Sequence, residues 1–194
     1  MKTETRSHRA LLVIDAQASF AARPSWHEVD HAAYLDAQNR LIAGFVAAGQ
    51  PVVRILHVEQ DGVFSRASGL VRPLDGLLDY PPALQVEKHA HSALAGTALR
   101  AWLIRAGINA VTISGIRSEQ CCETTARDAS DRGFKVDYVT EATLTFPMQH
   151  RSGRVYTVED IRERCELVLD GRFARICSVE QALAALPGRL ADAA

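Results

Sequence analysis

Short apolar runs alternate with amphipathic segments along this 194-residue chain. The runs are rich in Val, Ile and Leu and have the length of buried strands, whereas the segments between them repeat apolar residues at helical spacing. The segment 30–48 shows the helical spacing clearly, with Tyr34 and Leu41 on one face. The apolar runs predict strands at 10–14, 51–58, 84–88, 110–115, 134–140 and 172–177.

Glycine, proline and capping residues mark the ends of the predicted helices. Gly49 and Pro51 end the helix 30–48. Capping boxes at 157–160 and 178–181 begin the last two helices. Two further helices are expected at about 96–106 and 120–132. Strands that alternate with helices predict an α/β fold, a mainly parallel six-stranded sheet with helices on both faces in a three-layer α-β-α arrangement. We expect a single domain over residues 1–194.

The segment 59–82 has neither the helical nor the strand period. It holds three of the seven prolines and three of the twelve glycines. A loop of this length in a compact domain is usually functional, often a wall or a lid over a site. We therefore expect this loop to contribute to specificity, and its candidate side chains are Phe64, Arg66, Arg72 and Tyr80.

Composition narrows the classes of protein that are possible. The chain is 47% hydrophobic and 23% charged, which is typical of folded proteins and not of disordered ones. Its net charge of −1 gives no electrostatic reason to expect nucleic acid or an anionic membrane as a partner. No apolar run reaches the roughly 18 residues that span a bilayer, and the first 15 residues lack the apolar core of a signal peptide. We expect a soluble, cytoplasmic protein that acts on a small molecule.

Four polar side chains follow strands of the predicted sheet, and ligands of such sheets bind at the carboxyl ends of the strands. Asp15 follows the first strand, His57 the second and Lys88 the third, and Cys121 lies shortly after the fourth. A carboxylate, an ammonium and a thiol are thus expected to converge at one edge of the sheet.

The chemistry of these groups is complementary. A cysteine reacts as its thiolate, so its ordinary pKa of about 8.5 has to fall for reaction at neutral pH. Cys121 is expected in the first turn of its helix, where the helix dipole and Lys88 both favour the thiolate. Asp15 is placed to take the thiol proton and to pass it to a leaving group. Glu119 and Glu123 oppose the thiolate if they point toward the sulfur.

Three motifs in this order resemble the isochorismatase-like cysteine hydrolases, a superfamily that includes nicotinamidases and N-carbamoylsarcosine amidohydrolases. They are Leu-Val-Ile-Asp-Ala-Gln-Ala-Ser-Phe at 12–20, Lys-His-Ala-His-Ser-Ala-Leu-Ala-Gly-Thr at 88–97, and the segment 114–129, which contains Ser-Gly-Ile-Arg-Ser-Glu-Gln-Cys-Cys-Glu. Residues 141–146 and 171–176 also resemble that family's pattern. The resemblance runs from about residue 9 to 183, and it implies a Rossmann-like fold with a catalytic triad of Asp15, Lys88 and Cys121.

The same resemblance implies further features around the nucleophile. It places a non-proline cis peptide bond between Ile116 and Arg117, and it assigns the backbone N–H groups of Arg117 and Cys121 to an oxyanion hole. It places Gln17 and Phe20 on the near wall of the substrate pocket. It also implies a homodimer or homotetramer.

The implied reaction is acyl transfer from a carboxamide or a related C–N bond through a thioester on Cys121, with no cofactor. Two alternatives stay open: hydrolysis of a vinyl ether such as isochorismate, which needs protonation by Asp15 but no cysteine nucleophile, and a non-catalytic or redox-sensing role for a reactive thiol. The intact set of Asp15, Lys88 and Cys121 favours the amidohydrolase. We also expect no carrier domain after Ala194, which weakens the vinyl ether alternative.

Several residues near these motifs have plainer interpretations. We expect Cys122 to pack in the core in preference to a redox role, and Cys165 and Cys177 to be core residues as well. The segment 57–61 has the residue types of the Asp-x-His metal motif of nicotinamidases in another order, so we expect no metal and a locally hydrogen-bonded His57. His89 and His91 either line the pocket or face solvent.

Arg117 is larger than the residue often found beside the cis bond in this family. Its guanidinium is suited to bind a substrate carboxylate, which would select anionic substrates. It is equally suited to form an ion pair with Glu119, and the sequence favours neither interpretation.

Overall fold

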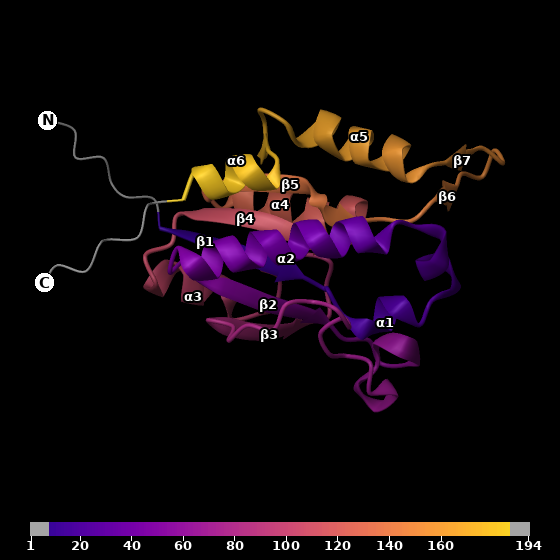
Figure 1. Ribbon diagram of the computed structural model, residues 1–194, viewed down its shortest axis with the longest axis horizontal. Coiled ribbons are helices and arrows are strands. Elements are labelled where there is room, and N and C mark those ends of the chain that lie inside the picture. Colours follow the sequence, from indigo (N-terminus) through magenta and orange to yellow (C-terminus); the bar gives the residue numbers. More distant parts are fainter. Residues whose placement is uncertain (1–7, 187–194) are drawn as a thin grey trace, which may run out of the picture.

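The computed structural model describes residues 8–186 and contains a six-stranded sheet in the order β3-β2-β1-β4-β5-β8. Figure 1 shows β3, β2, β1, β4 and β5 of this sheet. All neighbouring strands in it run parallel, which confirms the predicted α/β architecture. A separate antiparallel hairpin joins β6 (Met148–Gln149) and β7 (Val155–Tyr156). The strands of the main sheet are β1 (Arg9–Ile14), β2 (Val52–His57), β3 (Leu84–Lys88), β4 (Ala110–Ile116), β5 (Lys135–Leu144) and β8 (Arg175–Ile176).

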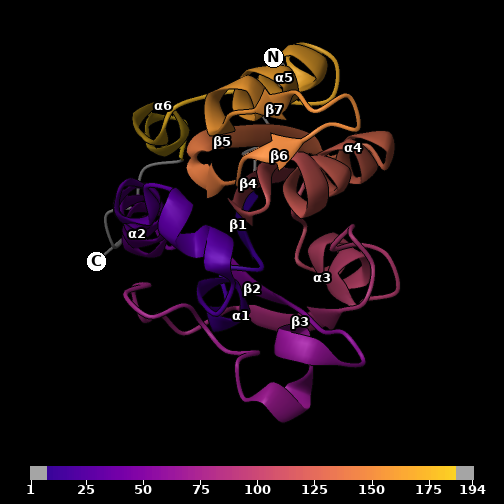
Figure 2. The same ribbon diagram turned by 90° about the vertical axis from the view of Figure 1, so that its right-hand side faces the viewer.

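Helices cover both faces of the sheet (Figure 2). One face packs against α2 (His31–Ala47) and α6 (Val179–Ala184), and the other against α3 (Leu99–Arg105), α4 (Glu123–Asp131) and α5 (Val158–Leu169). The remaining helical segments are short: α1 (Ala18–Ala21), the 3-10 turns η1 (Pro24–Glu28), η2 (Gly62–Phe64) and η3 (Arg66–Ser68), and the π-helical turn η4 (Ser118–Cys122).

The apolar runs form strands because they are buried on both sides. All six residues of β1 are buried. Leu12 and Ile14 face the core beneath α3 and α4, whereas Leu11 and Val13 face the core beneath α2. A central parallel strand therefore needs a continuous apolar sequence and not an alternating one. Both predicted capping boxes are present, at Thr157 of α5 and at Ser178 of α6.

Some element boundaries differ from the predictions. The last strand, expected over 172–177, contains only Arg175–Ile176. The preceding residues complete the turn after α5, because the N–H groups of Phe173 and Ala174 donate to the carbonyl of Leu169. β5 is longer than expected and runs to Leu144. The helix expected at 120–132 begins earlier, with the π-helical turn at Ser118. Neither α1 nor the β6–β7 hairpin was predicted from the sequence.

The loop 59–82 packs against the chain that follows β1. The N–H of Ala18 donates to the carbonyl of Arg72 at 2.9 Å, and the N–H of Ser19 donates to the carbonyl of Leu70 at 3.1 Å. The loop therefore covers the carboxyl end of the sheet beside β1, which agrees with its expected place near a site.

Two expectations extend beyond the described residues. The proposed domain limits of 1 and 194, and the first seven of the 15 residues tested for a signal peptide, lie in 1–7 and 187–194. Between residues 8 and 186, no helix combines the length and the apolar character needed to cross a bilayer.

Candidate active site

The sheet has a topological switch point between β1 and β4. From β1 the chain order proceeds outward through β2 and β3 on one side, and from β4 through β5 and β8 on the other. The connections diverge at this point, and ligands of such sheets usually bind outside the carboxyl ends of the two strands that flank it. Asp15 directly follows β1, and η4 with Cys121 follows β4, so both predicted groups lie at the switch point.

A glycine allows the two strands to approach closely there. Gly115 in β4 has φ +123°, and a Cβ atom added to it would lie 1.9 Å from the carbonyl oxygen of Ile14. Only glycine fits this position without a backbone shift. Asp15 itself has φ +50°, an unusual value for a residue with a side chain, and such conformations are often retained at functional sites.

The structure brings together the three side chains of the predicted triad. Lys88 Nζ lies 2.7 Å from Oδ2 of Asp15 and 3.3 Å from Sγ of Cys121. The side chains of Lys88 and Asp15 are 0% and 1% exposed, and Cys121 is 7% exposed. The ammonium thus lies between a carboxylate and a thiol in a region that solvent scarcely reaches.

The expected fall in the pKa of the thiol is wrong. Burial, together with the negative charge of Asp15, raises the pKa of Cys121 to about 12, and the opposing effect of Lys88 does not compensate. Burial also raises the pKa of Asp15, although the charge of Lys88 opposes that shift. The resting site therefore holds a protonated thiol next to a carboxylate that is suited to accept its proton.

The two acidic residues flanking Cys121 point to other partners. Glu119 Oε1 lies 2.9 Å from Nε of Arg117, and its Oε2 accepts a hydrogen bond from Thr145 at 2.5 Å. Glu123 accepts from Nε of Arg127 at 3.0 Å and also pairs with Arg164. Neither carboxylate is directed at the sulfur.

Hydrogen bonds that the sequence analysis missed hold the turn η4. The hydroxyl of Tyr138 donates to the carbonyl of Ser118 at 2.9 Å, and the hydroxyls of Ser118 and Thr143 lie 2.7 Å apart. The N–H of Cys122 donates to the carbonyl of Arg117 at 3.2 Å. The peptide bond between Ile116 and Arg117 is cis, at the position that the resemblance implies. Tyr138 and Thr143, which make two of these hydrogen bonds, lie in β5. Polar side chains within this strand were the sequence feature that could have pointed to them.

The predicted wall residues occupy different settings. Gln17 is fully buried, and its amide accepts from the N–H of His57 at 2.7 Å and donates to the His57 carbonyl at 3.0 Å. Phe20 packs its ring against Phe64 and Phe146, with centroids 5.0 Å and 6.1 Å away. Gln17 is therefore engaged within the protein, whereas Phe20 belongs to an aromatic cluster beside the site.

Arg117 forms the ion pair with Glu119 that was one of its two interpretations. Its guanidinium also lies over the ring of Phe146, 5.3 Å from the centroid. The side chains of Arg117 and Glu119 are 14% and 11% exposed, so the pair is mostly buried and carries little net charge.

The three histidines near the site have separate environments. His57 Nδ1 lies 3.1 Å from Lys88 Nζ, as expected for a locally hydrogen-bonded residue. His89 is exposed, and its Nδ1 lies 2.8 Å from the carbonyl oxygen of Val58. His91 is exposed as well, yet its Nδ1 lies 3.8 Å from Sγ of Cys121. Of His89 and His91, only His91 contacts the thiol.

The other three cysteines are buried free thiols. Cys122 is fully buried in the core shared with α4, which agrees with a packing role, and Cys165 and Cys177 are also core residues. In the described part of the chain, no three His, Cys, Asp or Glu side chains gather in an arrangement suited to a metal ion.

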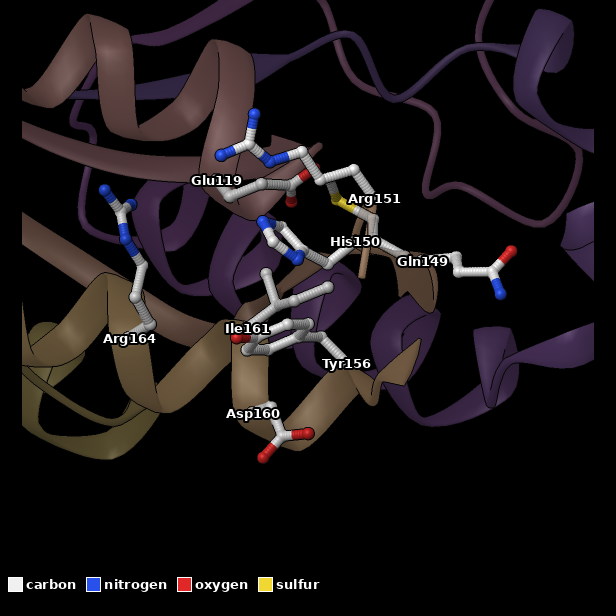
Figure 3. Close-up of a pocket in the computed structure, with 9 residues that line it drawn as sticks. Glu119, Gln149, His150, Arg151, Tyr156, Asp160, Ile161 and Arg164 are labelled. Carbon is white, nitrogen blue, oxygen red and sulfur yellow. The ribbon is translucent and has the colours of Figure 1, made fainter. Parts of the chain in front are cut away.

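A cavity of about 610 Å³ lies beside the β6–β7 hairpin and α5 (Figure 3). Glu119, His150 and Arg151 gather on one side of it, with Ile161 and Tyr156 facing them. The lining does not include Asp15, Lys88 or Cys121. Glu119 nevertheless connects this cavity with Arg117, the residue next to the cis bond.

Comparisons with known proteins find hydrolases among the relatives of this chain. Nicotinamidase 3 of Arabidopsis thaliana is 38% identical over 79 residues, which cover 41% of this chain and 39% of that protein. Streptothricin hydrolase of Streptomyces noursei is 32% identical over 158 residues, which cover 79% of this chain and 61% of that protein. In both alignments this chain spans less than two thirds of the relative's length.

Matches at the level of the whole fold are more extensive. A crystal structure of an isochorismatase-family hydrolase from Chromobacterium violaceum superposes with a TM-score of 0.85 at 26% identity and covers 96% of each chain. The sequence model of the Isochorismatase domain matches residues 9–172. Because that match covers most of the chain, the chain belongs to the isochorismatase family of hydrolases.

Proposed function

We propose that this protein hydrolyses a carboxamide or a related C–N bond of a small molecule through a thioester on Cys121. The observation that carries the proposal is the position of the Lys88 ammonium, 2.7 Å from the Asp15 carboxylate and 3.3 Å from the Cys121 sulfur. A nucleophile, a proton acceptor and a fixed positive charge are the parts that acyl transfer needs.

Acylation begins from the protonated thiol. Asp15 takes the thiol proton while Sγ of Cys121 bonds to the carbonyl carbon, and the carbonyl oxygen becomes an oxyanion. When the tetrahedral intermediate collapses, the C–N bond breaks and Asp15 returns the proton to the departing nitrogen. The nearby charge of Lys88 stabilises the carboxylate and the developing thiolate, so charge separation in a buried site is less costly.

Deacylation repeats these steps with water. Asp15 takes a proton from water, whose oxygen bonds to the thioester carbon. The C–S bond then breaks, and the sulfur recovers the proton as the acid leaves. We propose the backbone N–H groups of Arg117 and Cys121 as the oxyanion hole in both halves, on the strength of the resemblance. Removal of one such donor typically costs about 10²–10³ in rate.

Two further considerations support a C–N bond as the target. One of the relatives is a nicotinamidase, an amidase by name. Protonation of a vinyl ether by Asp15 has no use for a buried thiol held beside Lys88. We therefore place amide chemistry ahead of vinyl ether hydrolysis.

A panel of small carboxamides and ureides, assayed for release of ammonia or amine, tests this function. We expect Cys121→Ala and Asp15→Ala to abolish turnover. Cys121→Ala should keep the stability of the unmodified protein, whereas Asp15→Ala leaves Lys88 without its countercharge and is assayed below its unfolding transition, followed by circular dichroism. Cys122→Ala is the matched control, because it removes the adjacent thiol from a packing position. A vinyl ether hydrolase would keep its activity in Cys121→Ala, and undiminished amide turnover by that variant would refute the thioester mechanism.

A further inference from the structure

The Lys88 ammonium has more contacts than the proposed reaction requires. Besides Asp15 and Cys121, Nζ lies 3.1 Å from Nδ1 of His57 and donates to the carbonyl of Ala90 at 3.2 Å. An ammonium has three N–H donors and no acceptor. With two hydrogens directed at the carboxylate and the sulfur, the orientation of the ammonium depends on the acceptors of the third, which are Nδ1 of His57 and the carbonyl of Ala90.

The contact with Lys88 determines the tautomer of His57. Because the ammonium cannot accept, Nδ1 of His57 has to be the unprotonated acceptor, and the ring proton is on Nε2. Nε2 lies 3.4 Å from Oε1 of Glu59, a side chain that is 55% exposed. Burial and the charge of Lys88 lower the pKa of His57 to about 4, although Glu59 opposes the shift, so the imidazole is neutral at ordinary pH.

The position of His57 is itself fixed from two sides. The buried amide of Gln17 binds both the N–H and the carbonyl of His57, at 2.7 Å and 3.0 Å. The ring of Phe64 meets the imidazole edge to face, with centroids 5.9 Å apart. Gln17 follows Asp15 by two residues, so the loop that carries the acid also holds the histidine that contacts the lysine.

We propose that His57, supported by Glu59 and Gln17, is a positioning residue that aims the Lys88 ammonium at Asp15 and Cys121. The expected effect of His57 on turnover rests on the proposed function. Its expected effect on the reactivity of the Cys121 thiol does not depend on that function. The charged and titratable groups around the imidazole are Lys88 from β3, Glu59 from the loop after β2, and His91 from the segment after β3. Protonation of His57 would remove the acceptor and place a second cation beside Lys88.

Two amide substitutions of His57 distinguish a role in positioning Lys88 from a role in packing alone. In His57→Asn the side-chain oxygen can occupy the place of Nδ1 and still accept from Lys88, whereas in His57→Gln the oxygen reaches the place of Nε2. His89→Asn is the control, because His89 is an exposed histidine that binds the carbonyl of Val58. The readout is the rate at which iodoacetamide alkylates Cys121 at pH 9, measured on the peptide by mass spectrometry.

We expect His57→Gln to slow this alkylation about tenfold, since a hydrogen bond to a charged group is lost and Lys88 no longer faces the sulfur. His57→Asn and His89→Asn should stay close to the unmodified protein. With a carboxamide that the enzyme hydrolyses, kcat should fall in His57→Gln while KM is retained. Alkylation of His57→Gln at the rate of the unmodified protein would overturn the proposal.

The two proposals fail in different ways. If His57→Gln slows alkylation but the unmodified protein cleaves no amide, the positioning role stands and the proposed function falls. If the unmodified protein cleaves amides and His57→Gln alters neither alkylation nor kcat, the positioning role falls and the function stands. Should His57→Gln not fold, Glu59→Leu at the surface replaces it. We expect that variant to slow alkylation in the same direction, and no change would overturn the proposal.

Discussion

The Lys88 ammonium and the Asp15 carboxylate lie 2.7 Å apart at a depth where neither side chain is exposed to solvent by more than 1%. Taking two charges out of water costs several kcal/mol for each ion, and their attraction offsets this only while both partners are present. The fold therefore tolerates the two buried charges together but is destabilised when only one of them remains. Its position next to Cys121 links the stability of the fold to the chemistry of the site.

Replacement of Lys88 by methionine should destabilise the protein. The variant leaves the Asp15 carboxylate buried without its countercharge, and loss of one partner of a buried pair typically costs about 3–5 kcal/mol. The free energy of unfolding in urea measures this cost. The double variant Lys88→Met with Asp15→Asn should recover part of the loss, because no buried charge remains. Equal stability of Lys88→Met and the unmodified protein would show that the pair is not desolvated.

Asp15→Asn should raise the reactivity of the Cys121 thiol and still abolish hydrolysis. The negative charge of Asp15 helps to raise the pKa of Cys121 to about 12, so its removal lowers that pKa and increases the thiolate fraction at a given pH. In the unmodified protein, alkylation by iodoacetamide should keep rising beyond pH 10, whereas an ordinary thiol with a pKa of about 8.5 levels off earlier. Slower alkylation in Asp15→Asn would contradict this account.

Arg117→Ala should impair anionic and neutral carboxamides to a similar extent. The guanidinium is paired with Glu119 at 2.9 Å, so the position contributes little net positive charge to a substrate. KM values for a matched pair of an acid and its neutral amide analogue provide the measurement. The double variant with Glu119→Gln is the control for the carboxylate left behind. A KM increase of about tenfold or more for the acid alone would instead assign Arg117 to substrate recognition.

Gly115→Ala should be far more damaging than Gly133→Ala. A Cβ at Gly115 would overlap the carbonyl oxygen of Ile14 at 1.9 Å, whereas Gly133 has φ +87° and no atom within 4 Å of its added Cβ. The first substitution combines backbone strain with a clash and should cost more than about 3 kcal/mol, or prevent folding. The second has only the conformational penalty of about 1 kcal/mol. Similar free energies of unfolding would show that β1 and β4 separate easily.

The sequence was sufficient to predict the groups at the strand ends. Asp15 and Lys88 follow apolar runs of strand length, and parallel strands bring such positions to one edge. The residues between the strands were harder to predict. The two-residue β8 depends on a turn closed by the carbonyl of Leu169, and the π-helical start at Ser118 depends on Tyr138 in another strand. Such distant hydrogen bonds leave no local periodic signal.

Burial explains why two predictions, the low pKa of Cys121 and the place of Gln17 on the pocket wall, were wrong or incomplete. The helix position and the neighbouring lysine favour a low pKa for the thiol of Cys121, but desolvation, which no motif reveals, outweighs both. Likewise, the motif places Gln17 at the pocket wall, whereas in the structure its amide is engaged by the backbone of His57. The motif thus locates the residue without determining its partner.

Mass spectrometry of the intact enzyme during turnover tests the central claim most directly. A carboxamide that the protein hydrolyses is mixed with it, the reaction is stopped in acid within milliseconds to seconds, and the adduct is mapped to a peptide. We predict a mass increase equal to the acyl group on the peptide containing Cys121, and none in Cys121→Ala. Hydrolysis at the full rate by Cys121→Ala, with no adduct on the unmodified protein, would contradict the thioester mechanism.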